Sequence, residues 1–266
     1  MLQVSQLVKH FDGVKALNGV SFDIAGGECV ALIGPNGAGK STCFACIAGQ
    51  HVPTSGDIVW CGTSVTGWSA ARRQKSGIAR TFQVAQTFEA LTVLQNVQLI
   101  LASARGLSTF RRLNATDVET ATQQLAEVGL AHLAQVEVLG LPYGAKKRLE
   151  LAMALAGIAP SDQNPLEAKR LLLLDEPAAG LAGAERADLM RLVKSVASRG
   201  IAVLYTEHNM DAVFGVADRV LVLIDGQLAA QGRPDEIAQN TLVRSRYLGQ
   251  SFNVQTERPQ PMESNA

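Results

Sequence analysis

Three glycines, a lysine and two hydroxyl residues lie within nine consecutive positions near the start of the chain. They match the spacing G-x-x-x-x-G-K-[ST]. Glycines let successive backbone amides turn toward an anion, the lysine ammonium reaches the outer phosphates of a nucleotide, and the first hydroxyl can bind Mg²⁺. Average glycine usage makes a chance match roughly a one-in-a-hundred event. We therefore predict a phosphate-binding loop made of Gly34, Pro35, Asn36, Gly37, Ala38, Gly39, Lys40, Ser41 and Thr42.

Two adjacent carboxylates, Asp175 and Glu176, follow the apolar run Leu171–Leu174. A buried strand that ends in two acids supplies what a bound nucleotide still needs, namely a metal ligand and a group that acts on water. We predict that Asp175 holds Mg²⁺ through water and that Glu176 orients or deprotonates the attacking water. Acids at the turn after a strand are common in many proteins, so this pair indicates a nucleotide site only in combination with the phosphate loop.

The residues before the phosphate loop predict the elements that position it. From Leu2 to Ile24, apolar residues alternate in short strand-like runs, broken by the turn signals Asp12-Gly13 and Asn18-Gly19. This pattern predicts a small antiparallel sheet. The run Glu28–Ile33 then leads into the glycine-rich loop and a helix-compatible stretch, Thr42–Ala48, which predicts a strand-loop-helix unit.

Later apolar runs predict further strands and an α/β fold. The segments 78–82, 170–175, 201–206 and 219–224 have strand-like sequences. Two of them are continuously apolar, as is typical of a parallel sheet covered on both faces. At about 87–157 the pattern becomes helical and predicts an inserted subdomain. The apolar stripe that carries this prediction consists of Val118, Ala121, Leu125 and Val128.

Composition limits the class of protein. Hydrophobic residues make 47% of the chain and charged residues 18%, which argues against disorder. The balance of 24 basic against 24 acidic residues gives no general attraction to nucleic acid. We expect neither a membrane span nor secretion, because no run of eighteen apolar residues or signal peptide occurs. The four cysteines suggest no disulfide framework, and Cys43 and Cys46 are expected to be buried helix residues.

Taken together, these motifs resemble the ATPase subunit of ABC transporters, whose landmarks occur in the same order from Leu2 to about Gly249. The resemblance implies an α/β fold: a RecA-like P-loop NTPase core with an N-terminal antiparallel β subdomain and an inserted α-helical subdomain. It implies ATP and Mg²⁺ as cofactors, transmembrane permease subunits as partners, and two ATP molecules bound across a dimer. We expect one nucleotide-binding domain over residues 1–251 and a flexible tail over 252–266.

The order of these landmarks also implies functional roles for single residues. Phe11 matches the aromatic residue that stacks on adenine, although a core residue of an edge strand would look the same. Gln83 matches the glutamine that touches Mg²⁺ and water and senses the membrane subunit. His208 matches the switch histidine that bonds the terminal phosphate. Gly180 and Leu181 match the loop that crosses the dimer interface.

The segments 77–83, 175–181 and 246–249 narrow the resemblance to the branched-chain amino acid uptake group of ABC importers. That group also includes importers of urea, amides and small carboxylates. It implies a place on the cytoplasmic face of the bacterial inner membrane and, indirectly, a periplasmic substrate-binding protein. The alternatives are the ATPase of a lipopolysaccharide-export system, a soluble ABC ATPase that acts on ribosomes or DNA, and a non-catalytic regulator.

The signature segment departs from the family pattern. Most members have Leu-Ser-Gly-Gly-Gln where this chain has Leu141, Pro142, Tyr143, Gly144 and Ala145. Proline has neither a hydroxyl nor a backbone donor, so Tyr143, Gly144 and Ala145 are left to contact the ATP held by the partner. We therefore expect an asymmetric heterodimer with a second ABC ATPase, with a homodimer as the alternative.

Two other departures concern loops. Ala182 replaces the usual Asp or Asn of the crossing loop, which removes a polar link between subunits. Residues 160–168 form a longer segment than the short turn usual before the Asp175 strand, and a loop insertion of this kind costs little free energy.

Charged and apolar residues near the signature predict two surfaces. The run Lys146-Lys147-Arg148 is expected to form the solvated face of the signature helix. Phe88, Leu91 and Val93 are expected to be exposed and to receive a coupling helix of the permease, with ordinary subdomain core as an equal alternative.

Overall fold

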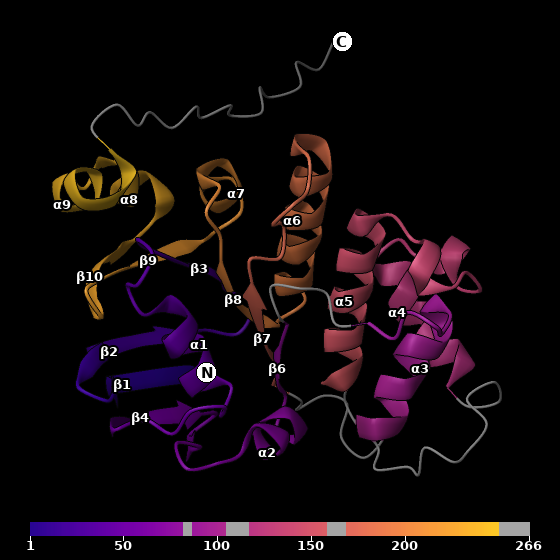
Figure 1. The fold of residues 1–266 in the computed structure, drawn as a ribbon, viewed down its shortest axis with the longest axis horizontal. Coiled ribbons are helices and arrows are strands. Elements are labelled where there is room, and N and C mark those ends of the chain that lie inside the picture. The colour runs from indigo at the N-terminus through magenta and orange to yellow at the C-terminus, as the bar shows by residue number, and fades with distance from the viewer. Residues whose placement is uncertain (82–86, 105–116, 159–168, 250–266) are drawn as a thin grey trace, which may run out of the picture.

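The structure is a computed structural model of the 266-residue chain, and it describes residues 1–81, 87–104, 117–158 and 169–249. Two β-sheets with their helices form one side of the molecule, and a group of helices forms the other (Figure 1). Within the described ranges, no helix is long and apolar enough to span a membrane. Gln83, the segment 160–168 and the tail 252–266 lie outside these ranges.

The first sheet is the predicted antiparallel one. It contains β1 (Leu2–Phe11), β2 (Val14–Ile24), β4 (Ser55–Trp60) and β5 (Thr63–Ser64) in the order β2-β1-β4-β5. Asp12 and Gly13 form the predicted turn, with φ angles of 40° and 91°. The turn predicted at Asn18-Gly19 is wrong. β2 continues through it, because Gly19 (φ 77°) is the extra residue of a β-bulge opposite the Leu7–Val8 step.

The main sheet has the strand order β10-β9-β3-β8-β7-β6. Its strands are β3 (Cys29–Ile33), β6 (Ile78–Arg80), β7 (Leu171–Asp175), β8 (Ala202–Thr206), β9 (Arg219–Ile224) and β10 (Gln227–Gly232). Neighbouring strands are parallel except β9 and β10. The predicted strands are confirmed, although the one predicted to start at Ile78 already ends at Arg80.

Both faces of the main sheet are buried, as its apolar runs predicted. In β3, Val30 and Leu32 belong to the core shared with the antiparallel sheet, whereas Ala31 and Ile33 belong to the core on the opposite face. The four leucines of β7 alternate in the same way. The period is two because successive side chains of a strand point to opposite faces.

Helices cover both faces of the main sheet. Helix α1 (Lys40–Ile47) packs in the core shared by the two sheets, where Cys43 and Cys46 are fully buried as predicted. Helix α2 (Ala70–Lys75) lies directly before β6. The remaining helices near the sheet are α6 (Gly183–Ala197), α7 (Met210–Phe214), α8 (Pro234–Gln239) and α9 (Thr241–Val243), followed by a π-helical turn at Arg244–Leu248.

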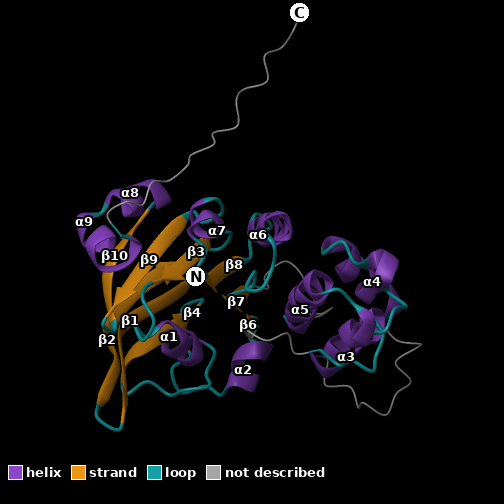
Figure 2. Ribbon diagram, turned by 45° about the horizontal axis from the view of Figure 1, so that its top comes forward, coloured by secondary structure: helices purple, strands orange, loops and turns teal. Residues whose placement is uncertain are grey.

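A second group of helices lies beside the sheets (Figure 2). It consists of α3 (Val93–Ala104), α4 (Val118–Glu127) and α5 (Tyr143–Gly157), with short 3₁₀ turns at Ala131–Leu133 and Val138–Gly140. In the predicted stripe Ala121, Leu125 and Val128 are fully buried, but Val118 is exposed at the first turn of α4.

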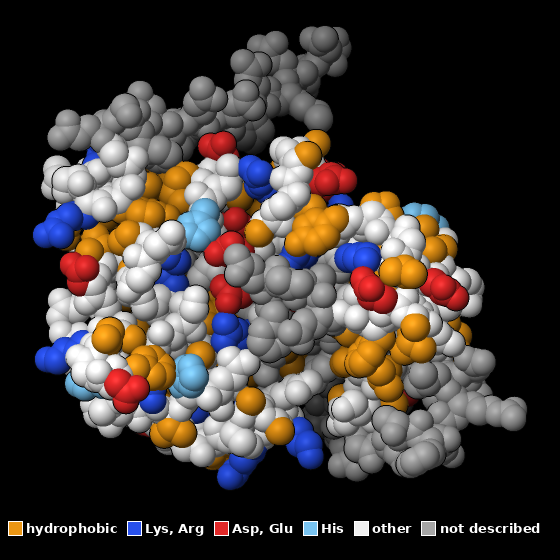
Figure 3. Space-filling model, in the orientation of Figure 1, with side chains coloured by type: hydrophobic (Ala, Val, Ile, Leu, Met, Phe, Trp, Pro, Cys, Tyr) orange, Lys and Arg blue, Asp and Glu red, His pale blue; other side chains and the backbone are white. Residues whose placement is uncertain are grey.

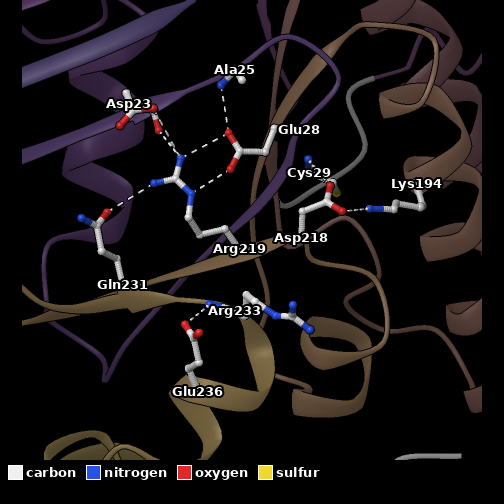
Figure 4. Close-up of polar contacts among 10 residues, drawn as sticks. All are labelled: Asp23, Ala25, Glu28, Cys29, Lys194, Asp218, Arg219, Gln231, Arg233 and Glu236. Carbon is white, nitrogen blue, oxygen red and sulfur yellow. Dashed lines mark hydrogen bonds and ion pairs between the residues drawn. The ribbon is translucent and has the colours of Figure 1, made fainter. Parts of the chain in front are cut away.

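A cluster of hydrogen bonds around Arg219 and Asp218 connects the two sheets (Figure 4). Arg219, the first residue of β9, donates to both carboxylate oxygens of Glu28, at 2.7 and 3.2 Å, and to the backbone oxygen of Asp23 in β2 at 2.6 Å. Beside it, the Asp218 carboxylate accepts from the backbone N–H of Cys29 at 2.9 Å. These contacts fix the start of β3, the strand that leads into the phosphate loop.

Candidate active site

The main sheet brings the predicted site residues to one edge. Because β3, β8, β7 and β6 are neighbours and parallel, their carboxyl ends lie together. Gly34 follows β3, Thr206 ends β8 and Asp175 ends β7. Open α/β sheets bind ligands in the crevice outside such strand ends. Acidic, basic and histidine side chains gather in the middle of the face shown in Figure 3, between the sheets and the helical group.

The phosphate loop has a backbone path that requires glycine at two positions. A Cβ on Gly34 (φ 147°) would lie 2.0 Å from the backbone oxygen of Leu223. A Cβ on Gly39 (φ 99°) would lie 2.4 Å from the backbone oxygen of Ala16. Helix α1 begins at the next residue, Lys40. Its unpaired N-terminal N–H groups and the positive end of its dipole are therefore directed at the loop.

Lys40 lies across this loop. Its Nζ donates to the backbone oxygens of Gly34 at 2.7 Å and Pro35 at 2.9 Å, and the residue is only 9% exposed. Burial lowers the pKa of its ammonium group, while the nearby carboxylates of Glu176 and Asp175 act to raise it. The ammonium is thus held between the loop and the acid pair by carbonyl contacts that the phosphate oxygens of a nucleotide can replace.

The acid pair is fixed by its neighbours across the sheet. Asp175 lies opposite Thr206 in the register of β7 and β8, and its Oδ1 accepts a hydrogen bond from Thr206 Oγ1 at 2.9 Å. Its Oδ2 forms an ion pair with Arg80 Nη2 at 2.8 Å. The same Thr206 Oγ1 accepts from the backbone N–H of Glu176 at 3.0 Å. One hydroxyl therefore orients both acids.

Glu176 and His208 form a pair, although they follow two different strands. The last residues of these strands, Asp175 of β7 and Thr206 of β8, are 31 positions apart in the sequence. Glu176 Oε1 lies 3.0 Å from His208 Nε2. Glu176 also has φ of 49°, a conformation that costs a non-glycine residue free energy and that is found preferentially at functional sites. The structure therefore brings the predicted base and the predicted switch histidine together beside the phosphate loop.

Glu207 is a neighbour that the sequence interpretation did not include. It is 4% exposed, and its Oε1 accepts from the backbone N–H of Ala178 at 2.8 Å. Burial raises the pKa of its carboxyl group, opposed by backbone hydrogen bonds from Ala178 and His208. It holds the loop after Glu176 against the end of β8. Its position next to His208 is the only sequence signal that points to it.

We expect Glu207→Gln to change how stability depends on pH. Because the folded-state pKa is raised, the folded chain holds this proton more tightly than the unfolded chain does, so wild-type stability falls as pH rises from the unfolded pKa through the folded one. Gln cannot ionise and keeps an oxygen for Ala178. The melting temperature of the variant relative to wild type should therefore increase from acidic to neutral pH. Parallel melting curves for the two proteins would contradict this, and exposed Glu119→Gln serves as the control.

The signature segment lies at the start of α5. Pro142 is the N-cap residue, gives no side-chain capping hydrogen bond, and accepts from Lys146 N–H through its carbonyl at 3.1 Å. Tyr143 is 45% exposed, and its ring lies against Gly180. Among the described residues, no hydrogen bond or ion pair connects Tyr143, Gly144 or Ala145 with the phosphate loop.

Two surface predictions need correction. Lys147 is 3% exposed and pairs with Glu150 at 3.3 Å, and its two basic neighbours are half-buried, so this run is not a solvated face. The reason is that α5 packs on α3, α4 and β6 together. Val93 is fully buried where α3 meets α5 and Leu91 is half-buried, so only Phe88, at 49%, is exposed as predicted.

Phe11 lies at the end of β1, next to the hairpin turn. It is 38% exposed, and its ring meets the His51 ring edge-on with centroids 5.2 Å apart. Lys9 Nζ lies 4.8 Å from the ring centre. This accessible ring is not a core residue, so the core alternative for Phe11 is wrong.

A cleft of about 390 Å³ separates the sheets from the helical group. Its walls come from α2 and β6 on one side and from α3 and α5 on the other. Gln74, Arg80, Ile100 and Met153 are among the residues that line it. Its floor is therefore the same strand, β6, that borders the acid pair.

A sequence profile described as ABC transporter matches residues 17–179, which include both the phosphate loop and the acid pair. The chain belongs to the ABC transporter family. Solved ABC structures agree with this assignment. A nucleotide-free ATP-binding cassette from an ABC transporter matches with a TM-score of 0.80 at 30% identity, over 94% of this chain and 99% of that one. The ADP conformation of the ABC cassette MJ1267 matches with a TM-score of 0.81 at 29% identity, over 94% and 98%.

Curated ABC relatives match along nearly their full length. The high-affinity branched-chain amino acid transport ATP-binding protein BraF of Pseudomonas aeruginosa is 35% identical over 94% of this chain and 98% of its own. LivG of Salmonella typhimurium, with the same description, is 34% identical with the same coverage. The lipopolysaccharide export system ATP-binding protein LptB of Acidithiobacillus ferridurans is 33% identical over 96% and 99%. The chain is thus an ABC ATPase subunit, and the predicted RecA-like α/β fold is confirmed.

Proposed function

We propose that this chain is the ATP-hydrolysing subunit of an ABC importer for branched-chain amino acids or related small polar compounds such as urea, amides and carboxylates. The observation that carries the hydrolytic role is the Glu176–His208 pair at 3.0 Å beside the Lys40 ammonium and the phosphate loop. The importer class is supported by the similarity to BraF and LivG. A lipopolysaccharide-export role is the second candidate, because LptB is nearly as similar.

The loop residues and Lys40 bind the phosphates of ATP, and Phe11 stacks on the adenine. An accessible ring at the hairpin end fits that role. Mg²⁺ usually keeps several waters and takes one or two protein oxygens plus substrate phosphates. The exposed Ser41 hydroxyl and the Asp175 carboxylate fit this requirement. Gln83 is the third residue of the proposed metal site. Bound Mg²⁺ would neutralise charge that develops on the phosphates.

Glu176 is the group that orients the attacking water and takes its proton. His208 stands within hydrogen-bonding distance of it and is 48% exposed at the side chain, so it can also reach a phosphate. Thr206 holds the Glu176 backbone in its positive-φ conformation. Protein groups fixed in this way reduce the reorganisation that the reaction would otherwise require.

The partners follow from the same proposal. Transmembrane permeases dock in the cleft between the sheets and α3–α5, at the cytoplasmic face of the bacterial inner membrane, with a periplasmic binding protein beyond them. The ATP bound by one subunit is completed by the signature segment of the other. Because Pro142 and Ala145 weaken this chain's signature, a different ABC ATPase with a fuller signature completes the site on this chain's phosphate loop. Residues 1–251 act as one nucleotide-binding domain, with the helical subdomain at about 87–157.

Purification from detergent with the neighbouring gene products tests the partners. We expect two permeases and a second ATPase to co-purify with this chain, and vesicles containing the complex to take up a branched-chain amino acid when ATP is supplied. Full ATP turnover by the chain alone would refute the heterodimer. Lipid-linked export instead of uptake would favour the second candidate.

Lys40→Ala should weaken ATP binding by at least about tenfold, since it removes a charge-assisted contact with the phosphates. Titration calorimetry with ATP measures this directly. Lys75→Ala is the matched control, because that lysine is exposed on α2. Equal ATP affinity of Lys40→Ala and wild type would show that the loop is not the phosphate site.

A further inference from the structure

Arg80 lies on the same face of the main sheet as Asp175. In the parallel pair of β6 and β7, Arg80 is opposite Leu173. Alternate residues of a strand share a face, so Asp175 is the diagonal neighbour of Arg80, one pleat further along. The Arg80 side chain bridges this step, with its Nη2 at 2.8 Å from Asp175 Oδ2.

The ion pair is sheltered from solvent. The side chains of Arg80 and Asp175 are 11% and 15% exposed, and charge-assisted hydrogen bonds of this length are the stronger ones in proteins. Thr206 Oγ1 donates to the other carboxylate oxygen of Asp175 at 2.9 Å. Among the described residues, each oxygen thus accepts from one donor, which leaves acceptor positions for a metal-bound water because a carboxylate has about four. The direction of the carboxylate is set from both sides.

Arg80 also contacts the helix that follows the phosphate loop. Its Nη1 donates to the side-chain oxygen of Gln50, just beyond α1, and its guanidinium carbon lies 5.8 Å from the ring centre of Phe44 in α1. The same residue lines the cleft between the sheets and α3–α5. Arg80 therefore joins three parts of the molecule: the acid of β7, the phosphate-loop helix and the cleft.

We propose that Arg80 is the positioning residue of the metal site, which orients the Asp175 carboxylate toward the divalent ion held with ATP. This inference rests on the proposed role of Asp175 as metal ligand. Residues that orient a metal ligand typically change metal affinity 10- to 100-fold when replaced. Arg80 belongs to this class because it holds the one oxygen of Asp175 that Thr206 does not.

Arg80 could affect metal binding in two ways, by orienting the Asp175 carboxylate or by repelling the cation, and these two effects predict opposite results of its removal. The positive guanidinium repels a divalent cation, so if charge were its main effect, removing it would tighten metal binding. If orientation is its main effect, removing it lets the carboxylate rotate, and metal binding weakens. The doubly fixed carboxylate favours orientation. Arg80→Met removes both effects, and Arg80→Lys keeps the charge while losing the planar guanidinium.

The test measures metal and nucleotide binding separately on the full-length chain. Mn²⁺ is titrated into protein that carries a non-hydrolysable ATP analogue, and loss of the free-ion electron paramagnetic resonance signal reports bound metal. We expect Arg80→Met to raise the Kd for Mn²⁺ by roughly tenfold or more, and Arg80→Lys to raise it by a smaller factor. Affinity for the analogue in EDTA should stay within about twofold of wild type, as expected for a residue that acts through the metal ligand.

Gln50→Ala is the control, because it removes an Arg80 hydrogen bond that does not involve Asp175. Its Mn²⁺ affinity should equal that of wild type. Unchanged or tighter Mn²⁺ binding in Arg80→Met overturns the inference. If Arg80→Met does not fold, unchanged Mn²⁺ binding in Arg80→Lys overturns it instead. If the wild-type chain adds nothing to the Mn²⁺ affinity of the free analogue, the proposed metal site itself is wrong.

Discussion

Replacing Glu176 by Gln should lower ATP turnover by about 10²- to 10⁴-fold, the usual contribution of a general base. Gln has the same shape, and its side-chain oxygen can still accept from His208, so the pair at 3.0 Å survives as a contact. What is lost is the ability to take a proton from water. Phosphate release under saturating ATP, in the complex with the natural partners, measures the effect.

ATP binding should persist in this variant, because Glu176 is not one of the phosphate-binding residues. We therefore expect an ATP affinity within about twofold of wild type, and accumulation of the closed, ATP-bound dimer on size-exclusion chromatography. Glu119→Gln makes the same chemical change on the exposed surface of α4 and should retain full turnover. Hydrolysis near the wild-type rate in Glu176→Gln would mean that another group acts as the base.

Of the substitutions proposed for this chain, Arg73→Met should cause the largest loss in the free energy of unfolding. Arg73 is fully buried in α2, and its guanidinium donates to the backbone oxygens of Cys46 at 2.6 Å and Ile47 at 2.7 Å, in the last turn of α1. It also donates to the backbone oxygens of Thr66 at 2.9 Å and Trp68 at 3.3 Å. A cation at this end of α1 is favoured by the helix dipole.

Met fills much of the same space but removes the Arg73 donor from the backbone oxygens of Ile47, Thr66 and Trp68, whereas the Cys46 oxygen still accepts from the N–H of Gly49 at 3.2 Å. Each buried unsatisfied group costs about 1–3 kcal/mol, partly offset because a charge no longer has to be buried. We expect a net loss of about 3 kcal/mol in the free energy of unfolding, measured by urea denaturation. Its neighbour Arg72 is exposed and lies 3.9 Å above the Trp68 ring, so Arg72→Met should cost at most about 1 kcal/mol. Similar urea midpoints for the two variants would show that Arg73 does not hold α1 in place.

The local chemistry of the site was predictable from the sequence. The phosphate loop depends on consecutive residues, because the backbone turn, the lysine and the start of α1 all lie within nine positions of the chain. The apolar runs of β7 and β8 are buried on both faces, so their patterns are unambiguous. Parallel strands bring their carboxyl ends to one edge, which places Asp175, Glu176 and His208 near the loop once the strands are known.

Tertiary structure decided which polar and apolar residues are buried and with what. Arg73 is a charged residue that lies inside although the rest of α2 is exposed, because backbone oxygens accept from its guanidinium. Lys147 lies inside because α5 packs on α3, α4 and β6 and Glu150 pairs with its ammonium group. Val93 is buried for the same reason. The Arg80–Asp175 ion pair joins residues 95 positions apart. Only the strand order and register put them one pleat apart, and nothing in the local sequence of either strand specifies that distance.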